Sequence, residues 1–183
     1  MTATVVGPIP IQQVLADVRA MSSSEFVDAY GPMVLVRMRS GIDAEAMEKR
    51  DEESWSFGTV NVQGARSSGP IAGIVDMHDG VAYPVRKVHA RFFSRTILLG
   101  RASSNDLHIA DPGVSKLHAR FRFDGDRLLI EDAGSSNGTF LNGQRVTTER
   151  PVQDSDVLSF GALRFRVLRA ANLYAFLKRL GPA

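Results

Sequence analysis

The chain has 183 residues and contains no cysteine, which excludes disulfides, thiolate nucleophiles and cysteine-bound zinc. Hydrophobic residues make up 44% of it, enough for one domain with extensions or for two small domains. The first residues lack a basic region followed by a long apolar run, and no stretch approaches the roughly 18 apolar residues of a membrane span. We therefore expect a soluble, cytoplasmic protein that makes no membrane contact.

Charge divides the chain into an acidic front half and a basic back half, although the net charge of the whole is only +2. Residues 1–80 carry 6 basic and 11 acidic side chains, a net charge of −5. Residues 81–169 carry 14 basic and 9 acidic side chains, a net charge of +5. A basic domain favours an anionic ligand and can also attract its own front half. Two differently solvated surfaces explain the same distribution without any ligand.

Residues 1–39 form a predicted helical, partly structured N-terminal region. Apolar residues recur every three or four positions from Ile11 to Met21, which predicts a helix. A capping box of Ser22 and Glu25 predicts that a second, short helix follows, and the next Gly-Pro pair ends it. The apolar run MVLVRM after that pair predicts a strand.

The middle of the chain separates two kinds of sequence. Residues 40–70 are first strongly charged and then rich in Gly, Ser and Pro, which predicts a linker. From about residue 81 onwards, short apolar runs with a period of two alternate with Gly, Asp, Asn and Ser. This pattern predicts an all-β fold, a sandwich of two antiparallel sheets, over residues 81–169.

Turns and the C-terminus complete the predicted domain. Asp124-Gly125 and Asn142-Gly143 each separate two β runs and predict tight hairpins. Residues 170–183 place their large apolar side chains on one helical face. They predict a C-terminal helix that packs against the sandwich.

Polar residues cluster in three loops between the apolar runs. Loops at one end of a sandwich lie together even when they are far apart in sequence. A phosphate group is bound by a forked guanidinium, an ammonium, hydroxyls and amide N–H groups. The loops supply such a set in Arg101, Ser115, Lys116, Ser136 and Asn137.

The same loops carry three motifs in a fixed order: Gly-Arg, Ser-x-x-His and Asn-Gly. They are Gly100-Arg101, Ser115 to His118, and Asn137-Gly138. This ordered set, embedded in β runs, resembles the forkhead-associated (FHA) domain family over about residues 82–168. The resemblance identifies a bacterial-type FHA protein with an N-terminal extension.

The resemblance implies a phosphothreonine-binding sandwich that acts as a non-catalytic adaptor in Ser/Thr kinase signalling. Arg101 and Ser115 would contact the phosphate, and Lys116 would add a basic contact. Ser136 would lie beside the threonine methyl group, and Asn137 would hydrogen-bond the peptide backbone. The implied partner is a phosphothreonine-containing protein, such as a Ser/Thr kinase or its substrate.

Three further residues at the site have implied structural roles. Gly100 permits the turn, His118 braces the binding loops, and Gly138 completes the last motif. Simpler explanations stay open for the binding residues themselves. Arg101 can form a surface salt bridge with a nearby aspartate such as Asp106 or Asp111, and the serines and asparagine can be ordinary turn residues.

Other classes of function find little support in the sequence. It has no HExxH, GxSxG, P-loop or Rossmann motif, so we expect no enzyme, metal or cofactor. Phenylalanines of the back half alternate with arginines and therefore face the core, whereas a nucleic-acid platform would expose them. The main alternative is an FHA-fold module that binds an unmodified partner through another surface.

The acidic front half suggests an intramolecular contact of residues 1–80 with the basic domain. Its carboxylates concentrate in one run, at Glu45, Glu48, Asp51, Glu52 and Glu53. A tethered segment has a high effective concentration near its own domain. One interpretation is that this run competes with phosphopeptide for the basic loop end, with Trp55 beside it as an anchor. The alternative is that Trp55 and the strand-like residues after it pack permanently on the sandwich, far from that end, or that the front half binds a partner.

Overall fold

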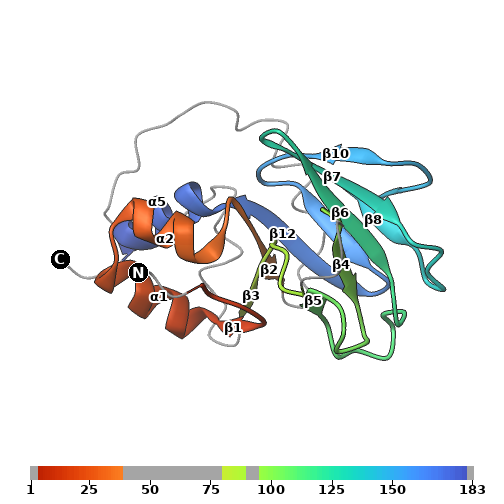
Figure 1. The fold of residues 1–183 in the computed structure, drawn as a ribbon, viewed down its shortest axis with the longest axis horizontal. Helices are drawn as coiled ribbons and strands as arrows, with labels where there is room; N and C mark the ends of the chain where they lie inside the picture. The colour runs from red at the N-terminus through yellow and green to blue at the C-terminus, as the bar shows by residue number, and fades with distance from the viewer. Residues whose placement is uncertain (1–3, 39–79, 90–94, 181–183) are drawn as a thin grey trace, which may run out of the picture.

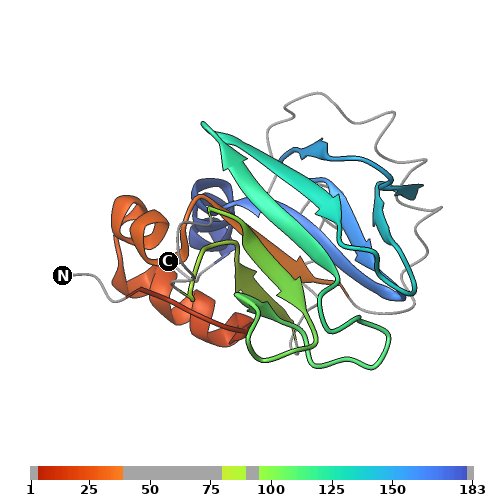
Figure 2. The same ribbon diagram turned by 45° about the vertical axis from the view of Figure 1, so that its right-hand side comes forward.

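The computed structural model describes residues 4–38, 80–89 and 95–180 (Figure 1). The predicted linker at 40–70, with its acidic run and Trp55, lies outside the described residues. Within them, two β-sheets face one another and three helices cover one of the sheets (Figures 1 and 2).

The larger sheet has seven strands in the order β1-β3-β2-β12-β11-β8-β9, and all its pairs are antiparallel. The strands are β1 (Ile9–Pro10), β2 (Met33–Arg37), β3 (Val81–Pro84), β8 (Thr139–Leu141), β9 (Gln144–Arg145), β11 (Val157–Phe160) and β12 (Leu163–Arg169).

The smaller sheet has five strands in the order β10-β7-β6-β4-β5, and only the β4–β5 pair is parallel. The strands are β4 (Ile97–Gly100), β5 (Leu107–His108), β6 (Ala119–Asp124), β7 (Arg127–Asp132) and β10 (Arg150–Val152). The helices are α1 (Ile11–Ala20), α2 (Ser23–Tyr30) and α5 (Ala170–Leu180).

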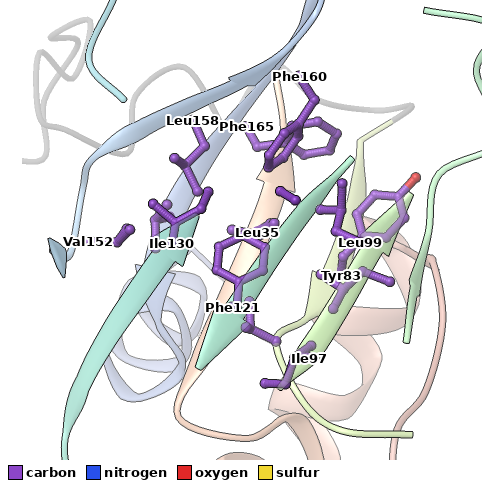
Figure 3. Packing of buried hydrophobic residues seen from close by; sticks show 14 of the residues in the cluster. Leu35, Tyr83, Ile97, Leu99, Phe121, Ile130, Val152, Leu158, Phe160 and Phe165 are labelled. Carbon is purple, nitrogen blue, oxygen red and sulfur yellow. The ribbon is translucent and has the colours of Figure 1, made fainter. Parts of the chain in front are cut away.

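A hydrophobic core fills the space between the two sheets (Figure 3). Alternate residues of the strands point into it, since successive side chains of a strand face opposite sides. Phe160 packs against two other aromatic rings of this core, with ring centroids 6.4 Å from Phe121 and 5.5 Å from Phe165. The predicted all-β sandwich is confirmed.

A second core lies between the larger sheet and the helices. Val34 and Val36 of β2 point into it, while Leu35 points into the sandwich. Because both faces of β2 are buried, its sequence is continuously apolar rather than alternating.

Strand β2 occupies an interior position of the larger sheet, between β3 and β12. The sequence pattern predicts this strand as part of a separate N-terminal region, with the sandwich confined to residues 81–169. The structure instead shows that residues 33–37 belong to the sandwich. The pairing joins segments that are far apart in the chain, so no local sequence pattern predicts it.

The helices begin and end as the sequence predicts. Ser22 Oγ accepts from Glu25 N (3.3 Å), and Glu25 Oε2 accepts from Ser22 N (2.8 Å), which confirms the capping box. Helix α5 packs on α1 and α2 as well as on the sheet: Phe26 contacts Tyr174, whose hydroxyl donates to Met21 O (2.9 Å). Residues 4–38 therefore contact the rest of the described chain mainly through apolar packing and β2.

Both predicted hairpins are present. Asn142 and Gly143 have φ values of 49° and 75° and form the two-residue turn between β8 and β9, as a type I′ turn requires. In the other hairpin Asp124 pairs with Arg127, so the turn is formed by Gly125 and Asp126, one residue later than predicted.

Candidate functional site

Four connections meet at one end of the sandwich: the β4–β5, β5–β6, β7–β8 and β11–β12 loops. Arg101 N donates to Ser115 O (2.9 Å), which joins the first two loops. Ser136 N donates to Ser115 Oγ (3.0 Å), which joins the third. Gly161 N donates to Gly138 O (3.2 Å), which joins the fourth. These bonds make one connected surface from segments up to sixty residues apart.

Gly100 allows the first two loops to approach each other. A Cβ at this position would lie 2.4 Å from Lys116 O and 2.8 Å from Asn105 Nδ2. Asn105 in turn donates to Ala102 O (2.9 Å) and Lys116 O (2.6 Å). Glycine is therefore required here by close approach of the backbones, and not by a left-handed conformation.

The side chain of Arg101 is exposed. Its Nε donates to Val114 O (3.2 Å), which fixes the plane of the guanidinium. Asp106 binds Lys87 (2.9 Å), and Asp111 accepts from Gly113 N (2.8 Å). Neither carboxylate neutralises Arg101, so its Nη atoms have no partner among the described residues.

Hydroxyl groups from the β5–β6 and β7–β8 loops meet at the same end of the sandwich. Ser115 Oγ accepts from Ser136 N and lies 3.4 Å from Ser136 Oγ. Lys116, the next residue, is exposed, and its ammonium has no partner in the described part of the chain. The Ser115 side chain thus joins two loops. An ordinary turn serine, the alternative explanation, would only satisfy the backbone of its own loop.

Asn137 connects the β7–β8 loop to the β5–β6 loop. Its Nδ2 donates to Gly113 O (2.8 Å), and the side chain remains exposed. A Cβ on Gly161 would lie 3.4 Å from Asn137 Cβ, so the β11–β12 turn packs beside it. Within the Asn137-Gly138 pair of the β7–β8 loop, the left-handed residue is Gly138, with φ +82°, and not Asn137.

His118 lies beneath these loops and is completely buried. Its Nδ1 accepts from Ser115 N (3.0 Å), so the proton resides on Nε2, which lies 3.2 Å from Gly138 O. Burial lowers the pKa of His118, outweighing the opposing effects of Gly138 and Asp132. A neutral imidazole therefore bridges the two binding loops, in keeping with its predicted structural role.

Two aspartates that are not predicted from the sequence as site residues stabilise the loops, the buried Asp106 and the partly buried Asp132. Asp132 accepts from Ser135 N (2.9 Å), Ser135 Oγ (2.7 Å) and Thr139 Oγ1 (2.6 Å). Burial raises the pKa of Asp132, but these hydrogen bonds outweigh it and the pKa lies below its usual value. The run Asp-Ala-Gly-Ser that begins at Asp132 is a recognisable turn signal, but the Thr139 contact is not local.

Asp106 stabilises the segment before β4, and the start of β4 itself, in the same way. Its oxygens accept from Lys87 Nζ, Val88 N, His89 N and Leu98 N, each at 2.9 Å. Burial raises its pKa, and these four donors together lower it below the usual value. Nothing in the sequence distinguishes Asp106 from a surface turn residue.

The structure brings together all five predicted binding residues on three hydrogen-bonded loops. Their assignment to a ligand remains a prediction. Among the described residues no group of three or more His, Asp or Glu is arranged to hold a metal. The described helices include none that is long and apolar enough to cross a membrane.

Comparison with known proteins identifies the domain. A family model described as FHA domain matches residues 97–161. An oxoglutarate dehydrogenase inhibitor from Corynebacterium jeikeium is 34% identical over 104 residues, which cover 54% of this chain and 67% of that protein. An FHA domain-containing protein from Arabidopsis thaliana is 41% identical over 69 residues, 36% of this chain but only 18% of that protein.

Solved structures include a chain from a study of phosphothreonine-dependent FHA domain interactions. It is 30% identical, with a TM-score of 0.43, and the match covers 51% of this chain and 88% of that one. The sequence comparisons agree with the three motifs found at the loop end. The chain therefore belongs to the FHA domain family.

Proposed function

We propose that the loop end binds a phosphothreonine-containing segment of another protein, and that the chain acts as a non-catalytic adaptor in Ser/Thr kinase signalling. Family membership supports this function, because the FHA motif residues are all in place. The partner is then a Ser/Thr kinase or one of its substrates.

One observation supports the proposal most strongly: the guanidinium of Arg101 is held in place but not neutralised. Its Nε is bound by Val114 O, while its Nη atoms have no partner in the described residues. A cation that is fixed and unpaired is preorganised for an anion, since little side-chain entropy is lost on binding. The nearby Ser115 hydroxyl and the Lys116 ammonium supply further donors.

The remaining roles follow from the same arrangement. Ser136 lies beside Ser115, so a threonine methyl group would lie against it when the phosphate is bound. Asn137 uses Nδ2 for Gly113 O, which leaves its Oδ1 to accept from a peptide N–H. No general base or nucleophile is needed, because recognition and not chemistry is the proposed activity.

The experiment that tests this function uses an oriented phosphothreonine peptide library with the full chain, followed by matched peptides. We expect binding of phosphothreonine peptides and none of their unphosphorylated forms. A phosphoserine version should bind several-fold more weakly, because a buried methyl group contributes on the order of 1 kcal/mol.

Two results would count against the proposal. Equal affinity for phosphothreonine and phosphoserine would show that the pocket recognises charge alone. Equal affinity for phosphorylated and unphosphorylated peptides would favour the alternative function, in which the domain binds an unmodified partner through another surface.

A further inference from the structure

Arg145 is an exposed cation at the loop end that the proposed phosphate pocket does not use. It lies on β9, paired in register with Phe140 of β8. A Cβ built on Gly138 would lie 3.4 Å from Arg145 Nε and 3.1 Å from Phe140 Cε2. The side chain of Arg145 therefore folds back against the Asn137-Gly138 turn.

The hairpin that carries Arg145 is firmly held. Val146 N donates to Thr139 O (2.9 Å) on one side of the ladder. At the turn, Asn142 Nδ2 donates to Asp156 Oδ1 and Asn142 Oδ1 accepts from Val157 N, both at 2.8 Å. A charge on such an element is placed more exactly than a charge on a free loop.

The charge of Arg145 is not neutralised within the described residues. Its side chain makes no hydrogen bond and no ion pair there. The carboxylates of the neighbouring loops are occupied, Asp132 by Ser135 and Thr139, and Asp111 by Gly113. An unpaired guanidinium thus stands beside Gly138, the residue that follows Asn137, and on a different element from Arg101.

We propose that Arg145 binds a second anionic group on the ligand, the carboxylate of an Asp or Glu close to the phosphothreonine in the peptide. The proposal rests on the proposed function, in which Asn137 holds the peptide backbone. A guanidinium next to that backbone contact reaches the side chains of neighbouring peptide residues. Its fork matches a carboxylate in geometry and charge.

The test measures fluorescence anisotropy of labelled phosphothreonine peptides with the full 183-residue chain. The flanking residues of the peptide are alanine, and Asp replaces them one position at a time. We expect Asp at one position to tighten binding about three- to fivefold, the range of an exposed ion pair. Arg145→Ala should abolish this preference, and Arg145→Lys should retain part of it.

Arg164→Ala is the matched control, because Arg164 is another exposed arginine of the same sheet, on β12. It should keep the full preference. The preference is a ratio of two affinities for one variant, so a modest loss of stability does not disturb it. Phosphothreonine binding that is unchanged by Asp at every position would overturn the role of Arg145 alone. Absence of phosphothreonine binding would overturn the proposed function together with it.

Discussion

At the scale of single residues, His118 shows how the binding loops are held without placing a charge beneath them. Its neutral ring accepts from Ser115 N and lies against Gly138 O. A protonated ring could not accept at Nδ1, and it would place a charge in the core that Asp132 offsets only in part. The stability of the domain should therefore depend on pH through this residue.

The direction of that dependence follows from the lowered pKa of His118. An unfolded histidine titrates near 6.5, and the folded form titrates below that value. As the pH falls, the unfolded chain thus takes up the proton before the folded one. The contribution of neutral His118 to the free energy of unfolding is therefore complete above pH 6.5 and is lost as the pH falls through the folded pKa. Urea unfolding should show a falling free energy of unfolding between about pH 7 and pH 5.

Two substitutions make the test specific. His118→Gln should lower stability at every pH and should flatten the slope in this range. His89→Gln, at an exposed histidine, should leave the slope unchanged. If His118→Gln retained the wild-type slope, the neutral bridge would not be its source.

Residue roles were predictable only where a motif carries them. The FHA pattern predicted Arg101, Ser115 and His118, and the structure places all three at one loop end. Asp106 has equally specific contacts, but its four donors come from residues 87–98. A buried aspartate of this kind is recognised only when the fold shows which backbone amides surround it.

At the scale of elements, strand β2 joins the N-terminal region to the sandwich. Val34 and Val36 are completely buried against the helices, and Leu35 is completely buried in the sandwich core. Removal of this strand would leave β3 and β12 without their shared neighbour. A fragment limited to residues 81–169 should therefore fail to fold cooperatively.

A pair of identical substitutions tests the contribution of β2. Val36→Ala removes two buried carbons and should cost about 2 kcal/mol of unfolding free energy. Val6→Ala makes the same change at a side chain that is 49% exposed, and should cost little. Chemical unfolding of both variants gives the comparison. Equal losses would show that β2 contributes no core packing of its own.

Local signals and long-range pairings differ in what a sequence can predict. The capping box at Ser22 and the turn at Asn142-Gly143 depend on adjacent residues, and the structure confirms both. The place of β2 depends on a partner, β12, that lies more than a hundred residues further along the chain. The run MVLVR indicates a buried strand but not its sheet.

At the scale of the whole molecule, the acidic front half and the basic back half share one fold. Residues 4–38 pack on the sandwich through α1, α2 and β2, so the intramolecular contact seen there is structural. The predicted competition by the acidic run at 45–53 lies outside the described residues. Deletion of residues 1–80 cannot test it, because the deletion would also remove β1 and β2.

Charge neutralisation in the full chain is the appropriate test of that competition. Replacing Glu45, Glu48, Asp51, Glu52 and Glu53 with the matching amides keeps every described strand. We expect phosphopeptide affinity to rise, and the gap from wild type to narrow in moderate salt, which screens exposed charges. Unchanged or lower affinity at every salt concentration would contradict the competition.

If Arg101 anchors the phosphate of a phosphothreonine peptide, two arginine variants should differ in phosphopeptide affinity. Arg127→Ala is the control: Arg127 lies at the β6–β7 hairpin, at the opposite end of those strands, in an exposed pair with Asp124. Both variants should remain folded, with unchanged thermal midpoints within a few degrees. By titration calorimetry, Arg101→Ala should weaken phosphopeptide binding about tenfold or more, since a charge-assisted bond is lost, and Arg127→Ala should bind like wild type. A folded Arg101→Ala that binds the phosphopeptide as tightly as wild type would contradict the claim.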